Sequence, residues 1–159
     1  MTDDQLQKAK KKALMLLTDR DRSVAELTEK LQKAGYEEAI IKETLSYVSS
    51  FGYLDDARYA RHFIEYYSGS RSYQRIRFDM GQKGLSKAVI DDAFEALEDP
   101  DEKPLIRKLV AKKWRTVKGE RREKEAKVIQ SLGRKGFRIG DIRAVLEEME
   151  EPDDPEEEV

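Results

Sequence analysis

The residues that could do chemistry are few and scattered. The chain of 159 residues has a single histidine, His62, and no cysteine. A zinc site or an activated nucleophile needs several such groups together, and a lone histidine beside an apolar helical stripe does not supply them. We therefore predict a surface or half-buried role for His62. The lack of cysteine also excludes disulfides and fits a reducing compartment.

One acidic pair, Asp55-Asp56, invites a catalytic interpretation. It directly precedes an apolar helical stripe, where an N-cap and a first-turn carboxylate explain it better. Tyr66, Tyr67 and Tyr73 could stack on nucleobases, but tyrosines at helical spacing are more often part of a core. No glycine-rich phosphate loop follows a strand pattern. The sequence thus predicts a protein that is not an enzyme and has no metal or cofactor.

Charge is concentrated in two neighbouring segments. Lys103 to Arg143 hold 15 basic and 4 acidic residues, a net of +11, whereas residues 144–159 hold 9 acidic residues and no basic one. Such a basic segment is typical of nucleic-acid binding or of docking on an acidic protein. A solvated helix face balanced by the acidic end is the alternative. For residues 151–159 we predict a disordered acidic tail that competes with DNA for the basic segment.

A pattern that recurs three times must position these residues. Gly35, Gly84 and Gly136 stand 49 and 52 residues apart, a spacing typical of stacked structural repeats. Apolar residues recur eight and four positions before each glycine and six and ten positions after it: Leu27, Leu31, Ile41 and Leu45; Ile76, Met80, Ile90 and Phe94; Val128, Leu132, Ile142 and Leu146. Apolar residues four apart on both sides of a glycine predict two amphipathic helices, with the glycine as the left-handed C-cap of the first.

Serines mark the start of these hairpins in two copies. Ser23 and Ser72 are 49 residues apart and are placed as N-caps, and Glu26 completes a capping box with Ser23. The third copy lacks this serine, so we expect its middle helix to start differently or to run longer. A leading apolar stripe precedes each hairpin, within residues 6–17, 57–67 and 105–114. Each copy is thus a three-helix unit, and the chain should hold about nine helices.

The fold class predicted from these patterns is all-α, as three tandem three-helix repeats in an elongated, curved array. With 38% hydrophobic and 40% charged residues, a row of small bundles fits better than one large core. We place the repeats at residues 1–54, 55–99 and 100–150, followed by the acidic tail at 151–159. The polar start and the lack of a long apolar run predict no signal peptide, no membrane partner and a cytoplasmic location.

Part of the second repeat resembles a known family. The run Gly52-Tyr53-Leu54-Asp55-Asp56, followed by Arg58, Tyr59, Ala60 and Phe63 and then by Arg75-Ile76-Arg77 and Lys83-Gly84-Leu85, resembles the central signature of the bacterial RecX regulatory proteins. The first and third repeats resemble the flanking repeats of that family, so the similarity covers roughly residues 8 to 150. The stretch Ser68 to Tyr73 departs from the family pattern, although Arg71 keeps a positive charge there.

This resemblance implies a non-enzymatic modulator of the RecA recombinase, active in DNA repair, recombination and the SOS response. Such proteins lie in the groove of the RecA filament on single-stranded DNA and typically inhibit strand exchange, ATP hydrolysis and co-protease activity. It implies that Tyr53, Leu54, Asp55 and Asp56 of the motif, which also includes Gly52 and Arg58, shape the junction between the first two repeats. The implied recombinase or DNA contacts are Arg58, Arg71, Arg75, Arg77 and Lys83 in the second repeat, and Arg115, Lys118, Arg121, Arg122, Lys124, Arg134 and Lys135 in the third.

Two other functions remain open for a monomer of this kind. A free-standing helix-turn-helix protein would bind duplex DNA sequence-specifically, but the charged positions are mostly Lys or Arg, which suit phosphates, and few Asn or Gln are present to read bases. A helical adaptor for an unrelated acidic protein would bind its partner whether or not the recombinase is present.

Overall fold

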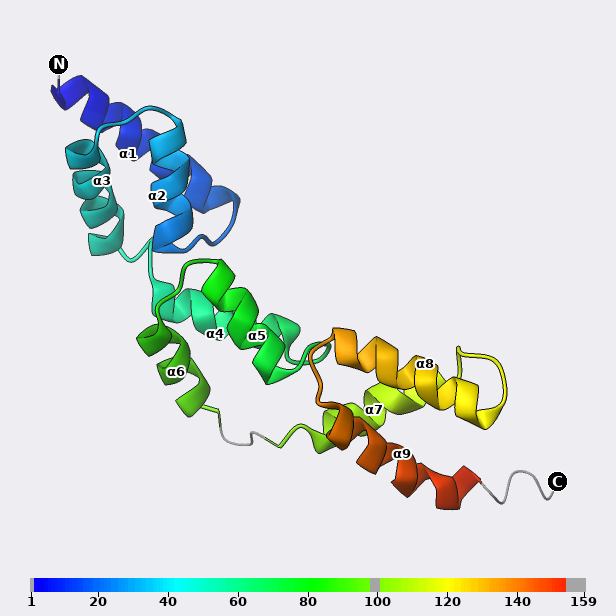
Figure 1. The fold of residues 1–159 in the computed structure, drawn as a ribbon. Helices are drawn as coiled ribbons and strands as arrows, with labels where there is room; N and C mark the ends of the chain where they lie inside the picture. Colours follow the sequence, from blue (N-terminus) through cyan, green and yellow to red (C-terminus); the bar gives the residue numbers. More distant parts are fainter. Residues whose placement is uncertain (1, 98–100, 154–159) are drawn as a thin grey trace. The chain divides into compact units, whose positions relative to one another are not determined.

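All regular structure in the described residues, 2–97 and 101–153, is helical in this computed structural model. These ranges hold nine helices and no strand, which confirms the all-α prediction (Figure 1). The helices are α1 (Thr2–Asp19), α2 (Val24–Lys33), α3 (Glu38–Ser50), α4 (Asp56–Tyr67), α5 (Tyr73–Gln82), α6 (Lys87–Glu95), α7 (Lys103–Trp114), α8 (Arg121–Arg134) and α9 (Ile139–Asp153).

Two of the sequence-based boundaries fall at the edges of these ranges. The predicted division between residues 99 and 100 lies outside the described residues, as do residues 154–159 of the predicted acidic tail. Helix α9 continues through Asp153, so it includes the first three residues of that segment. No helix in the described part of the chain is long and apolar enough to cross a membrane.

Glycine ends the middle helix of each triplet, as the spacing predicts. Gly35, Gly84 and Gly136 have φ angles of +91°, +85° and +96°, a conformation that glycine adopts without steric cost. The amide after each glycine donates to the carbonyl five residues earlier, which is the Schellman arrangement: Tyr36 to Leu31, Leu85 to Met80, and Phe137 to Leu132. The three predicted caps are confirmed.

The starts of the middle helices also follow the sequence. Ser23 and Glu26 form the predicted capping box, and the Oγ of Ser72 accepts a 3.0 Å hydrogen bond from the amide of Arg75. In the third copy the amide of Glu120 donates to Oε1 of Glu123 at 3.2 Å, so Glu120 takes the N-cap position that serine holds in the other two copies. Helix α8 has 14 residues where α2 has 10, which confirms the expected difference.

The chain divides into two compact units. One contains the described residues of Met1–Ile64 and Arg77–Leu97, and the other contains those of Glu65–Ile76 and Glu98–Val159. The division passes through α4 and α5, so the central triplet α4–α6 contributes to both units.

Each unit has its own apolar core at the positions that the repeat pattern predicts. In the first unit the helices α1, α2 and α3 and the following Leu54 bury Ala13, Leu27, Leu31, Ile41, Val48 and Leu54. In the second unit α7, α8 and α9 bury Ile106, Leu109, Val110, Val128, Leu132, Phe137, Ile142, Val145 and Leu146. Of the apolar positions aligned around the three glycines, only Leu45 and Phe94 are half-buried rather than buried.

Candidate nucleic-acid interface

The motif run Gly52 to Asp56 connects α3 to α4, and most of its residues have hydrogen bonds or packing contacts within the protein. Gly52 has a φ of +78°, and the amide of Tyr53 donates to the carbonyl of Val48 at 3.0 Å, which closes α3. Leu54 is buried in the core of the first unit. Tyr53 is 54% exposed and therefore remains available to a partner.

The two adjacent carboxylates cap two different helices. Oδ1 of Asp55 accepts from the amide of Arg58 at 3.1 Å, at the start of α4, which confirms the predicted N-cap. Oδ1 of Asp56 accepts from the amide of Val24 at 2.9 Å, at the start of α2. Burial raises the pKa of Asp56, although the hydrogen bond from Val24 opposes this. Both carboxylates thus have structural roles that explain them without catalysis.

The start of α2 and the end of α5 form a joint within the first unit. The Oγ of Ser23 donates to the carbonyl of Lys83 at 2.6 Å, and Nζ of Lys83 lies 3.7 Å from Oε2 of Glu26. A Cβ added at Gly84 would overlap the Cβ of Ala25. Glycine is therefore required here for close approach as well as for its positive φ.

The start of α5 and the end of α8 form the equivalent joint within the second unit. The amide of Ser72 donates to the carbonyl of Lys135 at 3.1 Å, and Nη1 of Arg75 donates to the carbonyl of Arg134 at 2.9 Å. The amide of Tyr73 donates to Oε2 of Glu102 at 2.9 Å, as Val24 does to Asp56, and burial raises the pKa of Glu102. In both joints a carboxylate at the start of a leading helix caps the middle helix of the preceding triplet.

The predicted contact residues of the second repeat all have partners within the protein. Nη1 of Arg58 donates to the carbonyl of Gly52 at 2.8 Å. The guanidinium of Arg71 lies 3.7 Å from the ring centre of Tyr67, and Nη1 of Arg77 donates to Asp91 at 2.8 Å. Since Arg75 and Lys83 are engaged at the joints, these five cations stabilise the protein itself. Their role as partner contacts stays a prediction.

Two predicted contact residues of the third repeat lie on an aromatic ring. Nζ of Lys124 is 4.3 Å and the guanidinium of Arg121 is 5.7 Å from the ring centre of Trp114. Arg121 also lies 3.4 Å from Glu125. A cation on the face of an indole is held by the negative potential of the ring. These two residues therefore fix the end of α7 against α8.

The remaining predicted cations are the ones available to a ligand. Within the described residues, none of their charged groups has an ion-pair or hydrogen-bond partner; they are Arg115, Lys118, Arg122, Arg134 and Lys135. The first four are exposed and Lys135 is half-buried. The carbonyls of Lys118, Arg134 and Lys135 each accept a hydrogen bond, so the backbone under these side chains is anchored.

Sequence reasoning missed two lysines near this group. A recess of about 400 Å³ in the second unit is lined by Gly69, Ser70, Leu109, Lys112, Lys113, Thr116, Ser131, Leu132 and Lys135. Of its three lysines only Lys135 is among the predicted contacts. The signal that could have found the others is the Lys112-Lys113 pair in the last turn of the predicted helix that ends near Trp114.

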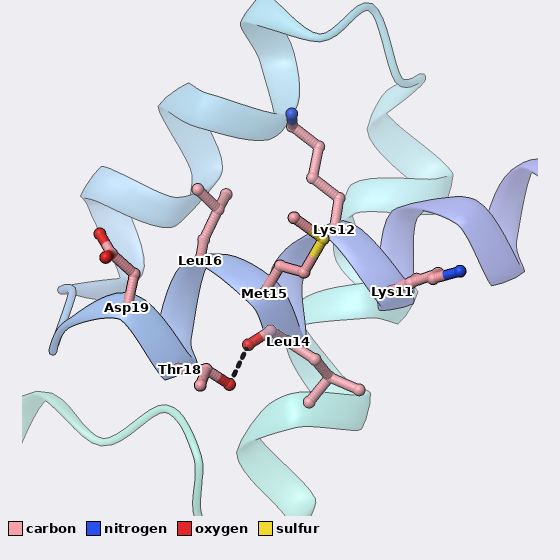
Figure 2. Close-up of a pocket in the computed structure, with 7 residues that line it drawn as sticks. All are labelled: Lys11, Lys12, Leu14, Met15, Leu16, Thr18 and Asp19. Atoms are coloured by element: carbon pink, nitrogen blue, oxygen red, sulfur yellow. Dashed lines mark hydrogen bonds between the residues drawn. The ribbon is translucent and has the colours of Figure 1, made fainter.

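Another recess lies along α1 in the first unit, and Figure 2 shows the side chains that line it. Its lining is mostly apolar, with Leu14, Leu16 and the 67% exposed Met15. The hydroxyl of Thr18 donates to the carbonyl of Leu14 at 2.7 Å, so it is satisfied within the helix. Asp19 is the single carboxylate in this lining.

His62 lies on the surface, as predicted. Its Nδ1 is 3.0 Å from Oδ2 of Asp21, and both side chains are exposed. Within the described residues no group of three or more histidine, aspartate or glutamate side chains could hold a metal ion.

Comparison with known proteins agrees with the triplet architecture. Residues 9–47, 55–93 and 101–146 match the first, second and third three-helix domains of RecX, respectively. The regulatory protein RecX of Chlorobium phaeobacteroides (strain BS1) is 32% identical over 155 residues, which cover 94% of this chain and 98% of that protein. The chain belongs to the RecX family. The resemblance inferred from the GYLDD run is thereby confirmed.

Further RecX proteins extend this agreement. The regulatory protein RecX of Vibrio vulnificus (strain CMCP6) is 34% identical over 135 residues, 84% of this chain and 88% of that protein. A crystal structure of a regulatory protein RecX matches with a TM-score of 0.77 and 27% identity, covering 92% of this chain and 75% of that one. RecX from Lactobacillus salivarius, at 23% identity, has the same fold, with a TM-score of 0.78 over 93% of this chain and 98% of that one.

Proposed function

We propose that this RecX-family protein is a non-enzymatic regulator of the RecA recombinase. It binds the recombinase filament on single-stranded DNA and inhibits strand exchange, ATP hydrolysis and co-protease activity. It acts as a monomer in the cytoplasm, where it limits recombination, DNA repair and the SOS response.

The observation that carries this proposal is the set of unpaired cations in the third repeat. Arg115, Lys118, Arg122 and Arg134 are exposed and lack ion-pair partners within the described residues, in a segment with a net charge of +11. Unpaired surface cations bind phosphates and release the counterions of DNA, which gives affinity without sequence preference. RecA coats single-stranded DNA of any sequence, so a regulator of its filament must bind without sequence preference.

We expect inhibition to act by occupancy of one state of the filament. A protein that binds the DNA or the recombinase in one state of the filament shifts the population toward that state and slows the steps that require another. The two units supply surfaces for such binding, and the central cations hold the joints in shape. Arg75, for example, cannot leave Arg134 without loosening the joint between α5 and α8.

An ATPase assay tests the proposal directly. RecA is assembled on single-stranded DNA, and the rate of ATP hydrolysis is measured as this protein is added. We expect a saturable fall in rate, with binding of the protein to the filament at the same concentrations. A filament that binds the protein with no change in ATPase or strand exchange would overturn the regulatory part of the proposal.

The alternatives predict different outcomes in two simple experiments. Sequence-specific binding to duplex DNA without recombinase would favour a free-standing helix-turn-helix protein. Capture of the same partner from lysates with and without the recombinase would favour a helical adaptor.

A further inference from the structure

The recess that contains Lys112, Lys113 and Lys135 has the chemistry of an anion site. Its lining includes these three lysines together with Ser70, Thr116 and Ser131, and it contains no carboxylate. The hydroxyls of Ser70 and Thr116 donate to the carbonyls of Tyr67 and Lys113, which leaves Ser131 as the hydroxyl donor for a ligand. The lining comes from the α4–α5 connection, from the end of α7 with the residues that follow, and from the end of α8. All of these residues belong to the second unit.

These ammonium groups lack partners within the described residues. Lys113 and Lys135 are half-buried, and Lys112 is exposed at the rim. Three lysines without a counter-ion at one recess concentrate positive charge there, and like charges close together repel each other. An anion bound between them would offset this repulsion.

Helix ends alone do not account for these lysines. Cations near a helix C-terminus interact favourably with its exposed carbonyls. Here the carbonyl of Lys113 already accepts from the amides of Thr116 and Val117 and from the hydroxyl of Thr116, and the carbonyl of Lys135 accepts from the amide of Ser72. The terminal carbonyls beside the recess are therefore satisfied without the ammonium groups.

We propose that this recess is a binding site for a phosphate group of single-stranded DNA. Lys113 and Lys135 hold the phosphate oxygens, the Ser131 hydroxyl donates a further hydrogen bond, and Lys112 meets the neighbouring phosphate at the rim. A recess of about 400 Å³ accommodates a phosphodiester with its adjoining sugar. This inference rests on the proposed function for the choice of DNA as the source of the phosphate, and it fixes where on the protein the strand is held.

A salt series with matched variants tests the site. The probe is a labelled oligothymidylate, and the protein is the full chain. The recess variant Lys113→Gln/Lys135→Gln is compared with the control Lys42→Gln/Lys108→Gln, which removes the same charge from exposed lysines that have no ion pair in the described residues and lie outside the recess. Each phosphate contact contributes roughly 0.7 to the salt slope on single strands. We expect the recess variant to lose about 0.7–1.4 of slope and several-fold affinity, and the control to resemble the wild type.

A neutral backbone identifies the group that is recognised. On an oligonucleotide with methylphosphonate linkages, wild type and recess variant should bind equally, because the phosphate charge is gone. Equal slopes for recess and control variants on ordinary DNA would overturn the site. A second result would also overturn it: inorganic phosphate binds at the recess, but the recess and control variants have the same affinity for DNA. The site would then bind free phosphate and not the DNA strand.

A second variant keeps the test decisive if the first one does not fold. Ser131→Glu places a carboxylate in the recess and should reduce DNA binding at least as much, with thermal melts confirming the fold. The RecA ATPase assay separates this inference from the proposed function. Inhibition that persists in the recess variants with unchanged DNA binding removes only the phosphate site, whereas recess-dependent DNA binding without any effect on RecA removes only the regulatory function.

Discussion

The hydroxyl of Ser23 donates a 2.6 Å hydrogen bond to the backbone carbonyl of Lys83, sixty residues further along the chain. The same oxygen accepts from the amide of Glu26, so one buried side chain caps α2 and binds the end of α5. A helix start carries a partial positive charge and a helix end a partial negative one, which makes this contact favourable. The first two triplets are therefore joined through their helix ends.

Replacing Ser23 tests this joint. Ser23→Ala removes both the cap and the bond to Lys83, and should lower the free energy of unfolding by about 2 kcal/mol or more. Ser86→Ala is the matched control, because the Oγ of Ser86 caps α6 and bonds to no second helix in the described part of the chain, and it should cost about 1 kcal/mol or less. Urea unfolding of both variants provides the measurement. Equal losses would mean that the bond to Lys83 adds nothing to stability.

Two glycines with similar φ angles but different surroundings give a second test. At Gly35 a Cβ would meet open space, so Gly35→Ala should cost only the left-handed strain, about 1 kcal/mol. At Gly84 the same Cβ would overlap Ala25, so Gly84→Ala should cost clearly more, by about 1–3 kcal/mol. Thermal melts compare the two, and indistinguishable melting temperatures would show that α2 and α5 do not approach closely in solution.

The raised pKa of Asp56 predicts a pH dependence of stability. Because the folded protein binds this proton more tightly than the unfolded chain, the contribution of Asp56 to stability falls as pH rises from the ordinary value of 3.8 through the raised folded value. Asn keeps an oxygen that accepts from Val24 and does not titrate. The free energy of unfolding of Asp56→Asn should therefore equal that of the wild type below pH 3.8 and exceed it increasingly toward neutral pH, as measured by urea unfolding across pH. A gain that shrinks as pH rises would contradict this sign.

Charge reversal of the unpaired cations tests the third repeat. The variant Arg115→Glu/Lys118→Glu/Arg122→Glu should weaken single-stranded DNA binding, flatten its salt dependence and reduce inhibition of RecA. Reversal at Arg121 and Lys124 would disturb the fold as well, since both lie on Trp114, and is a poor probe for that reason. A folded triple variant with the wild-type salt slope would show that this surface is merely solvated.

Local patterns predicted the elements well, because each depends on residues close in sequence. The glycine caps, the capping box of Ser23 and Glu26 and the buried positions around each glycine follow from helical spacing alone. The resemblance of the GYLDD run added the family of the chain, which spacing could not provide.

Contacts between distant segments were not predictable in this way. The bond from Val24 to Asp56 spans 32 positions and that from Tyr73 to Glu102 spans 29, and no periodicity relates their partners. For the same reason, the sequence did not indicate that Arg58, Arg75 and Arg77, which the family resemblance implies as partner contacts, also bind Gly52, Arg134 and Asp91 within the protein. The lysines of the recess were missed because the recess forms only when the α4–α5 connection meets α7 and α8.

Asp55 and Asp56 are neighbours in the chain that serve different helices, and this fixes the length of the connection before them. Asp55 must face the first turn of α4 while Asp56 reaches the first amide of α2. Inserting or deleting one residue between Gly52 and Asp55 would shift Asp56 relative to Val24 and so remove its carboxylate from the start of α2. The bond from Arg58 back to Gly52 spans the same few residues and imposes the same limit. Natural length variation should therefore fall elsewhere, such as in the loop before Glu120, whose capping partner Glu123 lies within the same helix.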